Sequence, residues 1–522
     1  MPESQKSVVL DPSQSTQVAG AAAKTAGEDD AHRGRTWSRL LSPVSRAIER
    51  GGYWVVPVLV AFALSVWRIG RPGLWRDELF TWERATRSVP DILSVIHEVD
   101  SVFIPYYLAM HVWTELFGTS PVALRLPSAL GMTASAGIVA LLGKRLFTPT
   151  TGVIGGLIFA FLPAISRYGQ EAKPHIFATL FTSLATLLLL RALEKPQWSR
   201  WVPYAAACTA IGFCHLLAFV VVFGHGVAVV ALEWQRNRSI LVKWATAAAA
   251  STVPVLVLAV AGFTNRGAMA WLPFTTVRSV FDYPVRLMSG SIFDLAGAGV
   301  LAGAILTLGV IGVATTKRPA SWILGVLALL PPLMLITAGR IEHVYHPRYL
   351  LYTVVAWAVL AAATVVALRP VFAVPLFVAI VALGIPSQLV HRQTNGHGDP
   401  EASAIADVVA ADGRPGDGVI FQASAGNWLA LGSEYYMARL DHEGASSGRP
   451  ALTTIECGPS QQCRVDTSRV WVICLGRHTD ALECLSPEKA DAVRQAYRTA
   501  PVRVHQTARF TLALYQSART PS

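Results

Sequence analysis

Two adjacent carboxylates, Asp77 and Glu78, follow the first apolar segment of the chain, Tyr53 to Trp67. Acidic side chains this close to a membrane span are uncommon and mark a functional site by default. A carboxylate can act as a general base that takes the proton of an alcohol. The pair can also do no more than complement the dipole of a helix that begins beside it. Only the first interpretation predicts chemistry on a hydroxyl group at the membrane surface.

More polar side chains lie in later loops, which the alternation of apolar spans places at the same membrane face as Asp77. Cations in these loops can hold a phosphate, and acids can act on an acceptor hydroxyl. The set therefore suits transfer of a group from a lipid phosphate to a hydroxyl. Glu171 of the second loop is a further candidate catalytic acid, and the candidate substrate-binding residues are Arg76, His97, Asp100, Arg167, Gln170, Lys173, His346, Arg348 and Tyr349.

Plainer interpretations stay open for some of these residues. Glu171 can form a structural ion pair with Arg167 or Lys173. The histidines of the same loops are better explained as interfacial or structural side chains than as metal ligands. Clustered acids could hold a divalent ion. The chain has no glycine-rich loop of the kind that binds nucleotide phosphates.

The apolar residues form long blocks, as expected of a chain that crosses a membrane many times. Of the 522 residues, 52% are hydrophobic and 15% are charged. Because lipid offers the backbone no hydrogen-bond partners, the spans must be helices. We expect an all-α membrane domain over residues 51–390, with a first outer loop at 70–123. Its spans, about 11 in number, are expected at 53–67, 124–143, 152–165, 176–190, 201–217, 218–234, 244–263, 291–314, 321–338, 348–368 and 371–388.

The basic residues indicate an orientation in a cytoplasmic membrane. The N-terminal tail, residues 1–50, lacks periodicity and is expected to be disordered. Its arginines precede the first span, which places this tail in the cytoplasm. The net charge of +11 is scattered over helix ends and loops, without a basic tract interleaved with aromatics. This distribution favours contact with lipid phosphates and argues against nucleic acid as a partner.

The chain turns polar from His391, and residues 391–522 predict a small α/β domain. Short buried strands are expected at 418–422, 469–475 and 507–515, and a helix at 486–497 with Ser486 as its N-cap. Cys208 and Cys214 are expected to be small apolar fillers in a span. Four cysteines cluster in this domain: Cys457, Cys463, Cys474 and Cys484. Their spacing is not typical of a zinc site, so two disulfides on an extracytoplasmic, oxidising side are favoured.

Six short motifs follow one another along the chain: Trp75–Glu78 (WRDE), Tyr106-Tyr107 with His111 and Trp113, Phe117-Gly118, Leu124–Ser128 (LRLPS), Arg167–Lys173 (RYGQEAK) and Pro347–Leu350 (PRYL). In this order and spacing they resemble the GT-C glycosyltransferases. The resemblance is closest to the branch that contains protein O-mannosyltransferases, aminoarabinose lipid A transferases and actinobacterial family-39-like proteins. It covers residues 53–200 well and the C-terminal domain poorly.

This resemblance implies a sugar donor linked to polyprenyl phosphate, an extracytoplasmic active site and inversion at the anomeric carbon. By position, Asp77 corresponds to the catalytic acid of the family and Glu171 to the acid of the second loop. Arg348 and Tyr349 correspond to a segment near the lipid phosphate. Mannose is the first expected sugar, and the acceptor is expected to be a glycan, lipid or protein of the cell envelope. Relatives similar to the O-mannosyltransferases are expected to work without a metal ion, so we expect no cofactor.

The chain departs from the family pattern at two places. Lys173 stands where many relatives have arginine, so a point charge replaces a forked guanidinium near the phosphate. Tyr106 and Tyr107, which the resemblance adds to the substrate-binding set, follow Val-Phe-Ile-Pro where many relatives have His-Pro-Pro. The second difference affects the shape of the donor groove.

Two other classes of protein fit parts of the pattern. A transporter or flippase for a lipid-linked or anionic solute would also combine many spans with charges at membrane level. Against it, the polar residues gather at one face and no internal repeat is evident. An inactive scaffold would be favoured by loss of the acids at Asp77 and Glu171, and both are present. A glycosyltransferase is therefore the preferred interpretation.

Overall fold

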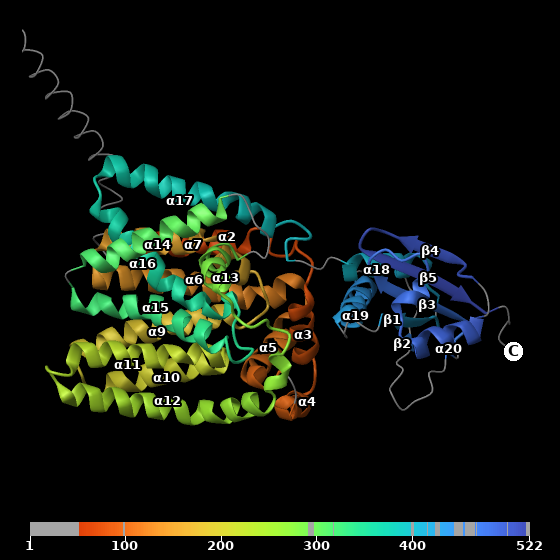
Figure 1. Cartoon of the computed structure of the whole chain (residues 1–522), viewed down its shortest axis with the longest axis horizontal. Coiled ribbons are helices and arrows are strands. Elements are labelled where there is room, and N and C mark those ends of the chain that lie inside the picture. Colours follow the sequence, from red (N-terminus) through yellow and green to blue (C-terminus); the bar gives the residue numbers. More distant parts are fainter. Residues whose placement is uncertain are drawn as a thin grey trace, which may run out of the picture.

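The computed structural model describes residues 52–97, 100–290, 297–316, 318–397, 401–414, 416–422, 428–442, 453–454, 465, 467–497 and 500–517. A bundle of long helices occupies one end of the molecule and a small α/β domain the other, with short helices between them (Figure 1). The long helices are α2 (Val55–Val66), α6 (Pro121–Leu146), α7 (Pro149–Phe161), α9 (His175–Glu194), α10 (Trp198–Cys214), α11 (Val220–Glu233), α12 (Arg238–Thr264), α14 (Ala298–Thr315), α15 (Trp322–Ala338), α16 (Val354–Ala367) and α17 (Pro370–His391).

A helix occupies each position where the sequence predicts a span, which confirms a polytopic, all-α membrane domain. Within the described residues, seven helices are long and apolar enough to cross a membrane, or eight if one bent pair forms a single span. Helices α2 and α15 are apolar but shorter. The total of about 11 spans therefore stays a prediction.

The bent pair joins α7 to α8 (Pro163–Gly169) at an angle of 64°. Pro163 starts α8 and has no backbone N–H to donate, so the helical hydrogen bonds are interrupted at this point. Helix α8 is buried along most of its length. The break therefore turns a polar segment, which includes Arg167, into the interior at one end of the bundle.

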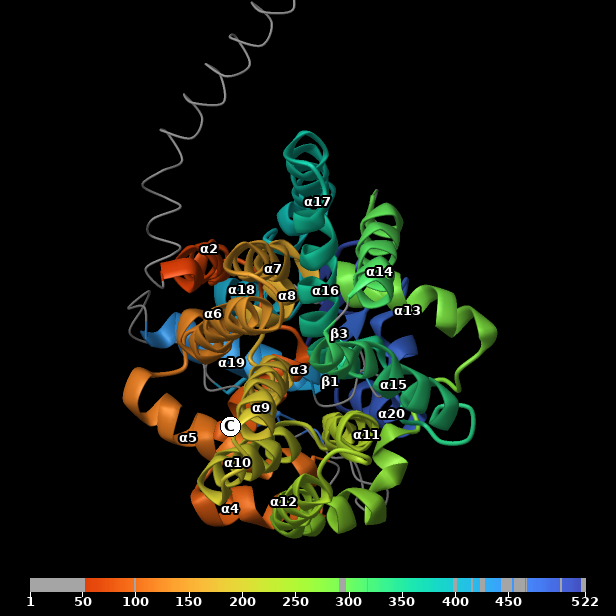
Figure 2. The ribbon, with the colours of Figure 1, turned by 90° about the vertical axis from the view of Figure 1, so that its left-hand side faces the viewer.

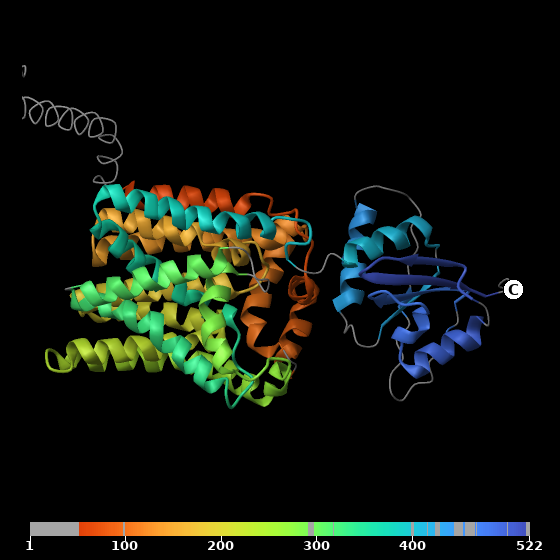
Figure 3. The same ribbon diagram turned by 45° about the horizontal axis from the view of Figure 1, so that its top comes forward.

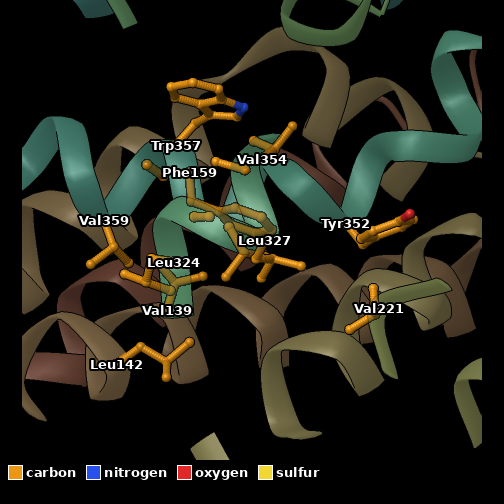
Figure 4. Packing of buried hydrophobic residues seen from close by; sticks show 14 of the residues in the cluster. Val139, Leu142, Phe159, Val221, Leu324, Leu327, Tyr352, Val354, Trp357 and Val359 are labelled. Carbon is orange, nitrogen blue, oxygen red and sulfur yellow. The ribbon is translucent and has the colours of Figure 1, made fainter. Parts of the chain in front are cut away.

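Helix α16 lies at the centre of the bundle and α17 at its edge (Figure 2). In the span that contains α16, 83% of the residues are buried, compared with 17% in α17 and 28% in α12. Figure 4 shows side chains of α16, such as Val354 and Trp357, packed with Phe159 of α7 and Leu327 of α15. The exposed apolar side chains of α12 and α17 form the surface that lipid would cover.

Short helices of the first outer loop cross the end of the bundle (Figure 3). They are α3 (Arg76–Ala85), α4 (Val89–Ser94) and α5 (Ile104–Phe117). Three more elements lie near the same end: helix α13 (Val277–Ser289) and the 3-10 helices η4 (Leu216–Phe219) and η7 (Pro347–Thr353). Ser88 caps α4, where its Oγ accepts a hydrogen bond from the Asp91 N–H at 3.4 Å. These helices bring separate loops together at one end of the bundle.

The C-terminal domain contains a mixed five-stranded sheet in the order β2-β1-β3-β5-β4. Strands β2 and β3 pair with β1 in parallel, and β5 pairs with β3 and β4 in antiparallel. The three predicted strands and the predicted helix are present, whereas β2, β4 and two helices are additions. The elements are α18 (Glu401–Asp412), β1 (Gly418–Phe421), α19 (Trp428–His442), β2 (Thr453–Thr454), β3 (Arg469–Leu475), α20 (Pro487–Tyr497), β4 (Arg503–Gln506) and β5 (Phe510–Gln516).

Cysteines of this domain form a disulfide between Cys474 of β3 and Cys484. Cys457 and Cys463 lie outside the described residues. Cys208 is buried in the bundle and Cys214 is half-buried, and both are free thiols. Their surroundings agree with the predicted role as apolar fillers.

Candidate active site

Asp77 lies in the first turn of α3 and forms an ion pair with Arg348 of η7, with 2.8 Å between the carboxylate Oδ2 and the guanidinium Nη1. The Asp77 side chain is 20% exposed, so a substrate can reach it, whereas Arg348 is 10% exposed. The Arg348 guanidinium also lies over the ring of Trp75, 5.5 Å from its centre. A carboxylate from the first loop and a cation from a distant loop thus meet at one point.

The pKa of Asp77 is lowered from its ordinary value. Burial opposes ionisation of the carboxyl group, but the positive charges of Arg348, Lys173 and Arg76 outweigh it. Arg76 itself is exposed at the start of α3. Asp77 is therefore a carboxylate, with no proton of its own, at neutral pH.

Glu78 follows Asp77 directly in the chain, but its side chain contacts different residues. It is fully buried and forms a two-pronged ion pair with Arg125 of α6, whose Nε and Nη2 donate at 2.7 and 2.6 Å. Its Oε1 also accepts a hydrogen bond from the Ala172 N–H at 3.0 Å. Burial opposes ionisation here too, but the Arg125 charge holds the pKa of Glu78 well below its usual range. Glu78 thus joins the first loop, α6 and the second loop.

Glu171 is buried and forms an ion pair with Arg167 at 2.9 Å. Burial raises the pKa of Glu171, and the charges of Arg167 and Arg348 only partly oppose this effect. This contact agrees with the interpretation of Glu171 as part of a structural ion pair, but the pair uses only one of the two carboxylate oxygens. The other oxygen, Oε1, is buried without a hydrogen-bond partner. Glu171 therefore has capacity to bind a further group.

Lys173 is buried among aromatic rings of the first loop. Its ammonium group lies 5.3 Å from the ring centre of Phe103 and 5.9 Å from that of Tyr107. The Tyr107 hydroxyl donates to Asp100 at 3.2 Å, and Tyr106 lies beside Tyr107 with its own hydroxyl buried and unpaired. A point charge in this aromatic environment is weakly hydrated and can attract an anion strongly.

Three imidazole rings surround Tyr349. The centres of the His215, His346 and His175 rings lie 4.8, 5.6 and 5.9 Å from the Tyr349 ring. His215 and His175 are themselves 5.2 Å apart. Burial, followed by the charge of Arg348, lowers the pKa of His346 to about 3. The His346 ring is therefore neutral and can contribute hydrogen bonds without adding charge.

Unpaired polar atoms concentrate at this place. Buried donors and acceptors without partners are uncommon in native proteins, and each one calls for an explanation. Ring contacts and ion pairs connect the residues that carry them, directly or through Tyr107 or Tyr349, to Arg167, Arg348 or Lys173. The atoms are Trp75 Nε1, Tyr106 Oη, Glu171 Oε1, His175 Nδ1, His215 Nδ1 and Arg348 Nε. A bound polar ligand would satisfy such a set.

The remaining predicted residues have separate locations. The Gln170 amide donates to the carbonyls of Ser65 and Trp67 at 2.7 and 2.9 Å, and so holds the end of α2. The side chain of His97 lies outside the described residues. Within the part of the chain that the structure describes, no group of three or more His, Cys, Asp or Glu side chains is arranged to hold a metal ion.

The candidate list omitted residues that the structure places at the centre of the cluster. His215 follows the apolar run of α10 at its C-terminal end, and a lone histidine at the end of such a run is a usable signal. His175 lies in the second loop, two residues after the motif Arg167–Lys173, but it is not among the candidate substrate-binding residues. Arg125 could not be recognised as the partner of Glu78, because 47 residues separate them.

An apolar cavity of about 520 Å³ opens beside the cluster. Its lining residues come from η4, α11, α12 and α15, and Leu216 of η4 is the residue after His215 in the chain. Its lining is almost entirely apolar: Leu216, Leu217, Phe219, Val220, Val222, Phe223, Trp244, Ala248, Thr252, Met334, Leu335 and Ala338. The volume lies within the usual range of ligand pockets, roughly 300–1,000 Å³.

Comparisons with known proteins agree with the motif-based expectation. Residues 102–262 match the family described as dolichyl-phosphate-mannose-protein mannosyltransferase. A comparison with curated protein sequences finds no match.

Among solved structures, ArnT from Cupriavidus metallidurans in the apo state is similar, with a TM-score of 0.58 and 13% identity over 94% of this chain and 100% of that chain. ArnT from the same organism bound to undecaprenyl phosphate gives a TM-score of 0.55 and 13% identity over 90% and 98% of the two chains. The oligosaccharyltransferase of Archaeoglobus fulgidus gives a TM-score of 0.48 and 13% identity over 73% and 63%.

Proposed function

We propose that this chain, which has the fold of the GT-C superfamily of glycosyltransferases, transfers a single sugar from a polyprenyl-phosphate donor to an acceptor hydroxyl. Mannose is the first sugar to test, since the family matched over residues 102–262 is described as a mannosyltransferase. The reaction takes place on the extracytoplasmic side of the cytoplasmic membrane, with the N-terminus in the cytoplasm. The acceptor is a glycan, lipid or protein of the cell envelope.

One observation carries the proposal. An ionised, accessible carboxylate, Asp77, lies against Arg348 within a shell of buried polar atoms that lack partners. Lys173 and Arg167 add positive charge to the same place. A base beside a concentration of cations is what a hydroxyl and a phosphate leaving group need together.

In the proposed reaction, the acceptor oxygen attacks the anomeric carbon from the face opposite to the phosphate. The new carbon–oxygen bond forms as the bond to the phosphate oxygen breaks, and the configuration inverts. Asp77 takes the proton of the acceptor hydroxyl. The phosphate leaves with the bonding electrons, and Arg348, Lys173 and Arg167 compensate its charge. Glu78 keeps α3 in position, and Glu171 binds a sugar hydroxyl through its free oxygen.

Donor binding would also prepare the base. In the structure Arg348 is paired with Asp77, which lowers the basicity of the carboxylate. A phosphate that approaches Arg348 shares this positive charge and adds negative charge nearby. Both effects raise the pKa of Asp77. The base thus becomes stronger only when a donor is in place.

The apolar cavity supports a lipid-linked donor. A polyprenyl chain needs an apolar surface that leads away from a polar headgroup site, and Leu216, the residue after His215 of the cluster, lines this cavity. The rings of His175, His215 and His346 surround Tyr349, over which the Arg348 guanidinium lies, and can act as hydrogen-bond partners for the phosphate or the sugar. The similarity in fold to ArnT bound to undecaprenyl phosphate is compatible with this arrangement.

The decisive experiment compares sugar transfer by wild type and by Asp77→Asn. Purified membranes receive radiolabelled polyprenyl-phosphate mannose or, in a separate assay, the corresponding polyprenyl-phosphate donor of arabinofuranose. The label is then followed into lipid, glycan and protein fractions. We expect wild type to transfer label and Asp77→Asn to be slower by about 10²- to 10⁴-fold, since a general base contributes that much. The labelled fraction identifies the acceptor.

Glu83→Gln is the matched control, because Glu83 lies on the same helix and pairs with Arg87 on its other face. It should transfer at the wild-type rate. Equal rates for wild type and Asp77→Asn would refute Asp77 as the base. Movement of an intact donor or anion across the membrane without any transfer would favour the transporter interpretation instead.

A further inference from the structure

A second cavity, with a polar lining, is located at the other end of the bundle, away from Asp77. Its volume is about 510 Å³. Helix α9 connects the two ends, with His175 at the candidate active site and Glu194 at this cavity; its 20 residues span about 30 Å. The lining residues come from the ends of α6, α9 and α10: Arg145, Leu188, Arg191, Glu194, Lys195, Ser199, Arg200 and Pro203.

The cavity has an excess of positive charge. Four of its lining residues are cationic and only Glu194 is acidic. Glu194 forms an ion pair with Arg145, yet the Nε of Arg145 remains buried without a partner. No ion pair satisfies Arg191 or Lys195 among the described contacts. The site therefore has more cationic capacity than its own acid uses.

The loop that forms the cavity is held in place by backbone contacts. Arg200 donates from Nη1 to the Arg191 carbonyl at 2.9 Å, and Lys243 of α12 donates to the Pro196 carbonyl at 2.7 Å. These contacts fix the backbone from which the cationic side chains project. Leu188 and Pro203 add an apolar surface next to the charges.

Basic residues at the inner ends of membrane helices also arise from topology alone, because positive charge favours the cytoplasmic side. That rule explains scattered cations on a surface. It does not explain a cavity of this size with a buried, unpartnered guanidinium nitrogen. Basic pockets between transmembrane helices on the cytoplasmic side bind the headgroups of anionic lipids.

We propose that the cavity lined by Arg145, Arg191, Lys195 and Arg200 binds the headgroup of an anionic phospholipid in the leaflet opposite to the candidate active site. The lipid phosphate contacts the cationic side chains, Ser199 offers a hydroxyl to the headgroup, and the acyl chains follow the apolar surface at Leu188 and Pro203. This inference does not depend on the proposed glycosyltransferase activity.

Native mass spectrometry of the purified full-length protein tests this inference. Dioleoyl phosphatidylglycerol is compared with dioleoyl phosphatidylcholine and with water-soluble glycerol 1-phosphate. We expect wild type to prefer the anionic lipid, and Arg191→Gln/Lys195→Gln to reduce this preference about 30-fold, as the loss of two cations near a membrane surface implies. Arg191→Lys keeps the charge and should retain the preference.

The matched control is Arg236→Gln/Arg369→Gln, which removes two cations from loops at the same end but outside the cavity. It should keep the wild-type preference, and a thermal unfolding midpoint equal to wild type shows that each variant is folded. Equal losses in the cavity and control variants, or no preference in wild type, would overturn the proposal. Binding of glycerol 1-phosphate as tight as that of the anionic lipid would show a free phosphate site and refute a lipid site.

Discussion

At the scale of single residues, two neighbouring acids have different environments because a helix rotates by about 100° from one residue to the next. Asp77 is accessible and meets Arg348, whereas Glu78 is fully buried and meets Arg125. The structure therefore separates an acid that is available to a substrate from an acid that holds the loop. Mutation of each should affect a different property.

Glu78→Gln should destabilise the protein by about 3–5 kcal/mol, because it leaves Arg125 charged and unpaired in a buried position. Asp77→Asn should destabilise the protein less than Glu78→Gln, since the Asp77 and Arg348 side chains are 20% and 10% exposed whereas those of Glu78 and Arg125 are fully buried. Thermal unfolding of the purified variants measures both. Similar stabilities for the two variants would contradict the assignment of a structural role to Glu78.

The lowered pKa of Asp77 predicts the pH dependence of transfer. Asp77 must be ionised to act as base, so kcat/KM, which reports the free enzyme, should fall only below the ordinary aspartate pKa of 3.8. The acid limb of kcat, which reports the donor complex, should lie at higher pH because the phosphate raises this pKa. Arg348→Gln should move the kcat/KM limb upward, and Arg76→Gln should move it less. Coincident limbs in wild type would argue against this coupling.

The sequence predicted the residue types of the site better than their contacts. Asp77, Glu171, Lys173 and Arg348 were all selected from their loops and motifs, and they do lie in one cluster. Their pairing could not be foreseen, since 271 residues separate Asp77 from Arg348. The individual catalytic and binding roles stay predictions.

At the scale of helices, close packing depends on residues that lack a side chain. A Cβ atom at Gly312 of α14 would lie 2.4 Å from the Leu360 carbonyl oxygen of α16. Gly303 of the same helix has open space at this position. Small residues let membrane helices approach each other closely. The contact of α14 with the central helix therefore depends on Gly312.

Gly312→Ala should destabilise the bundle by about 1–3 kcal/mol, because the methyl group must displace backbone atoms of α16. Gly303→Ala should be neutral or stabilising by up to about 1 kcal/mol, since alanine favours a helix. Denaturation of both variants in the same detergent compares them directly. If both substitutions have the same effect, packing of α14 against α16 is not limited by Gly312.

The helices themselves were largely predictable, because lipid requires long apolar segments and each of these forms a helix. The 64° break between α7 and α8 was not predicted, although Pro163 marks it. A proline inside an apolar run is compatible with either a kink or a loop. Only the packing of neighbouring helices decides how far the chain turns.

At the scale of the whole molecule, the C-terminal domain contacts the loop that carries Asp77. Tyr436 of α19 accepts a hydrogen bond from the Leu74 N–H at 2.8 Å, and Tyr435 donates to the Thr119 carbonyl at 3.0 Å. The Tyr435 ring also meets Trp82 of α3 edge to face, with 5.1 Å between centres. The domain thus holds α3 from the side opposite to the bundle. Leu74 and Tyr436 are 362 positions apart, so no local sequence pattern indicates their contact.

Tyr436→Phe should weaken this contact by about 1–3 kcal/mol, because the buried Leu74 N–H loses its partner. Amide hydrogen exchange at residues 74–85 should become faster, and sugar transfer should become slower although Tyr436 touches no substrate. Tyr497→Phe removes a hydroxyl that bonds to the Thr467 carbonyl within the same domain and serves as control. Unchanged exchange at α3 in Tyr436→Phe would show that the domain does not hold the loop.

The residues that surround Glu78 are synthesised at different times. Arg125 is synthesised soon after Glu78, but His397, whose Nδ1 lies 3.5 Å from Arg125, and Thr394, whose carbonyl accepts from the Gly73 N–H, are synthesised much later. For the 272 residues between Arg125 and His397, translation at 5–20 residues per second takes roughly 15–55 s. During this interval the segment around Glu78 is uncovered, because these contacts are missing. A chain that stops before residue 394 keeps this uncovered form, so early termination exposes a surface that cellular quality control can recognise.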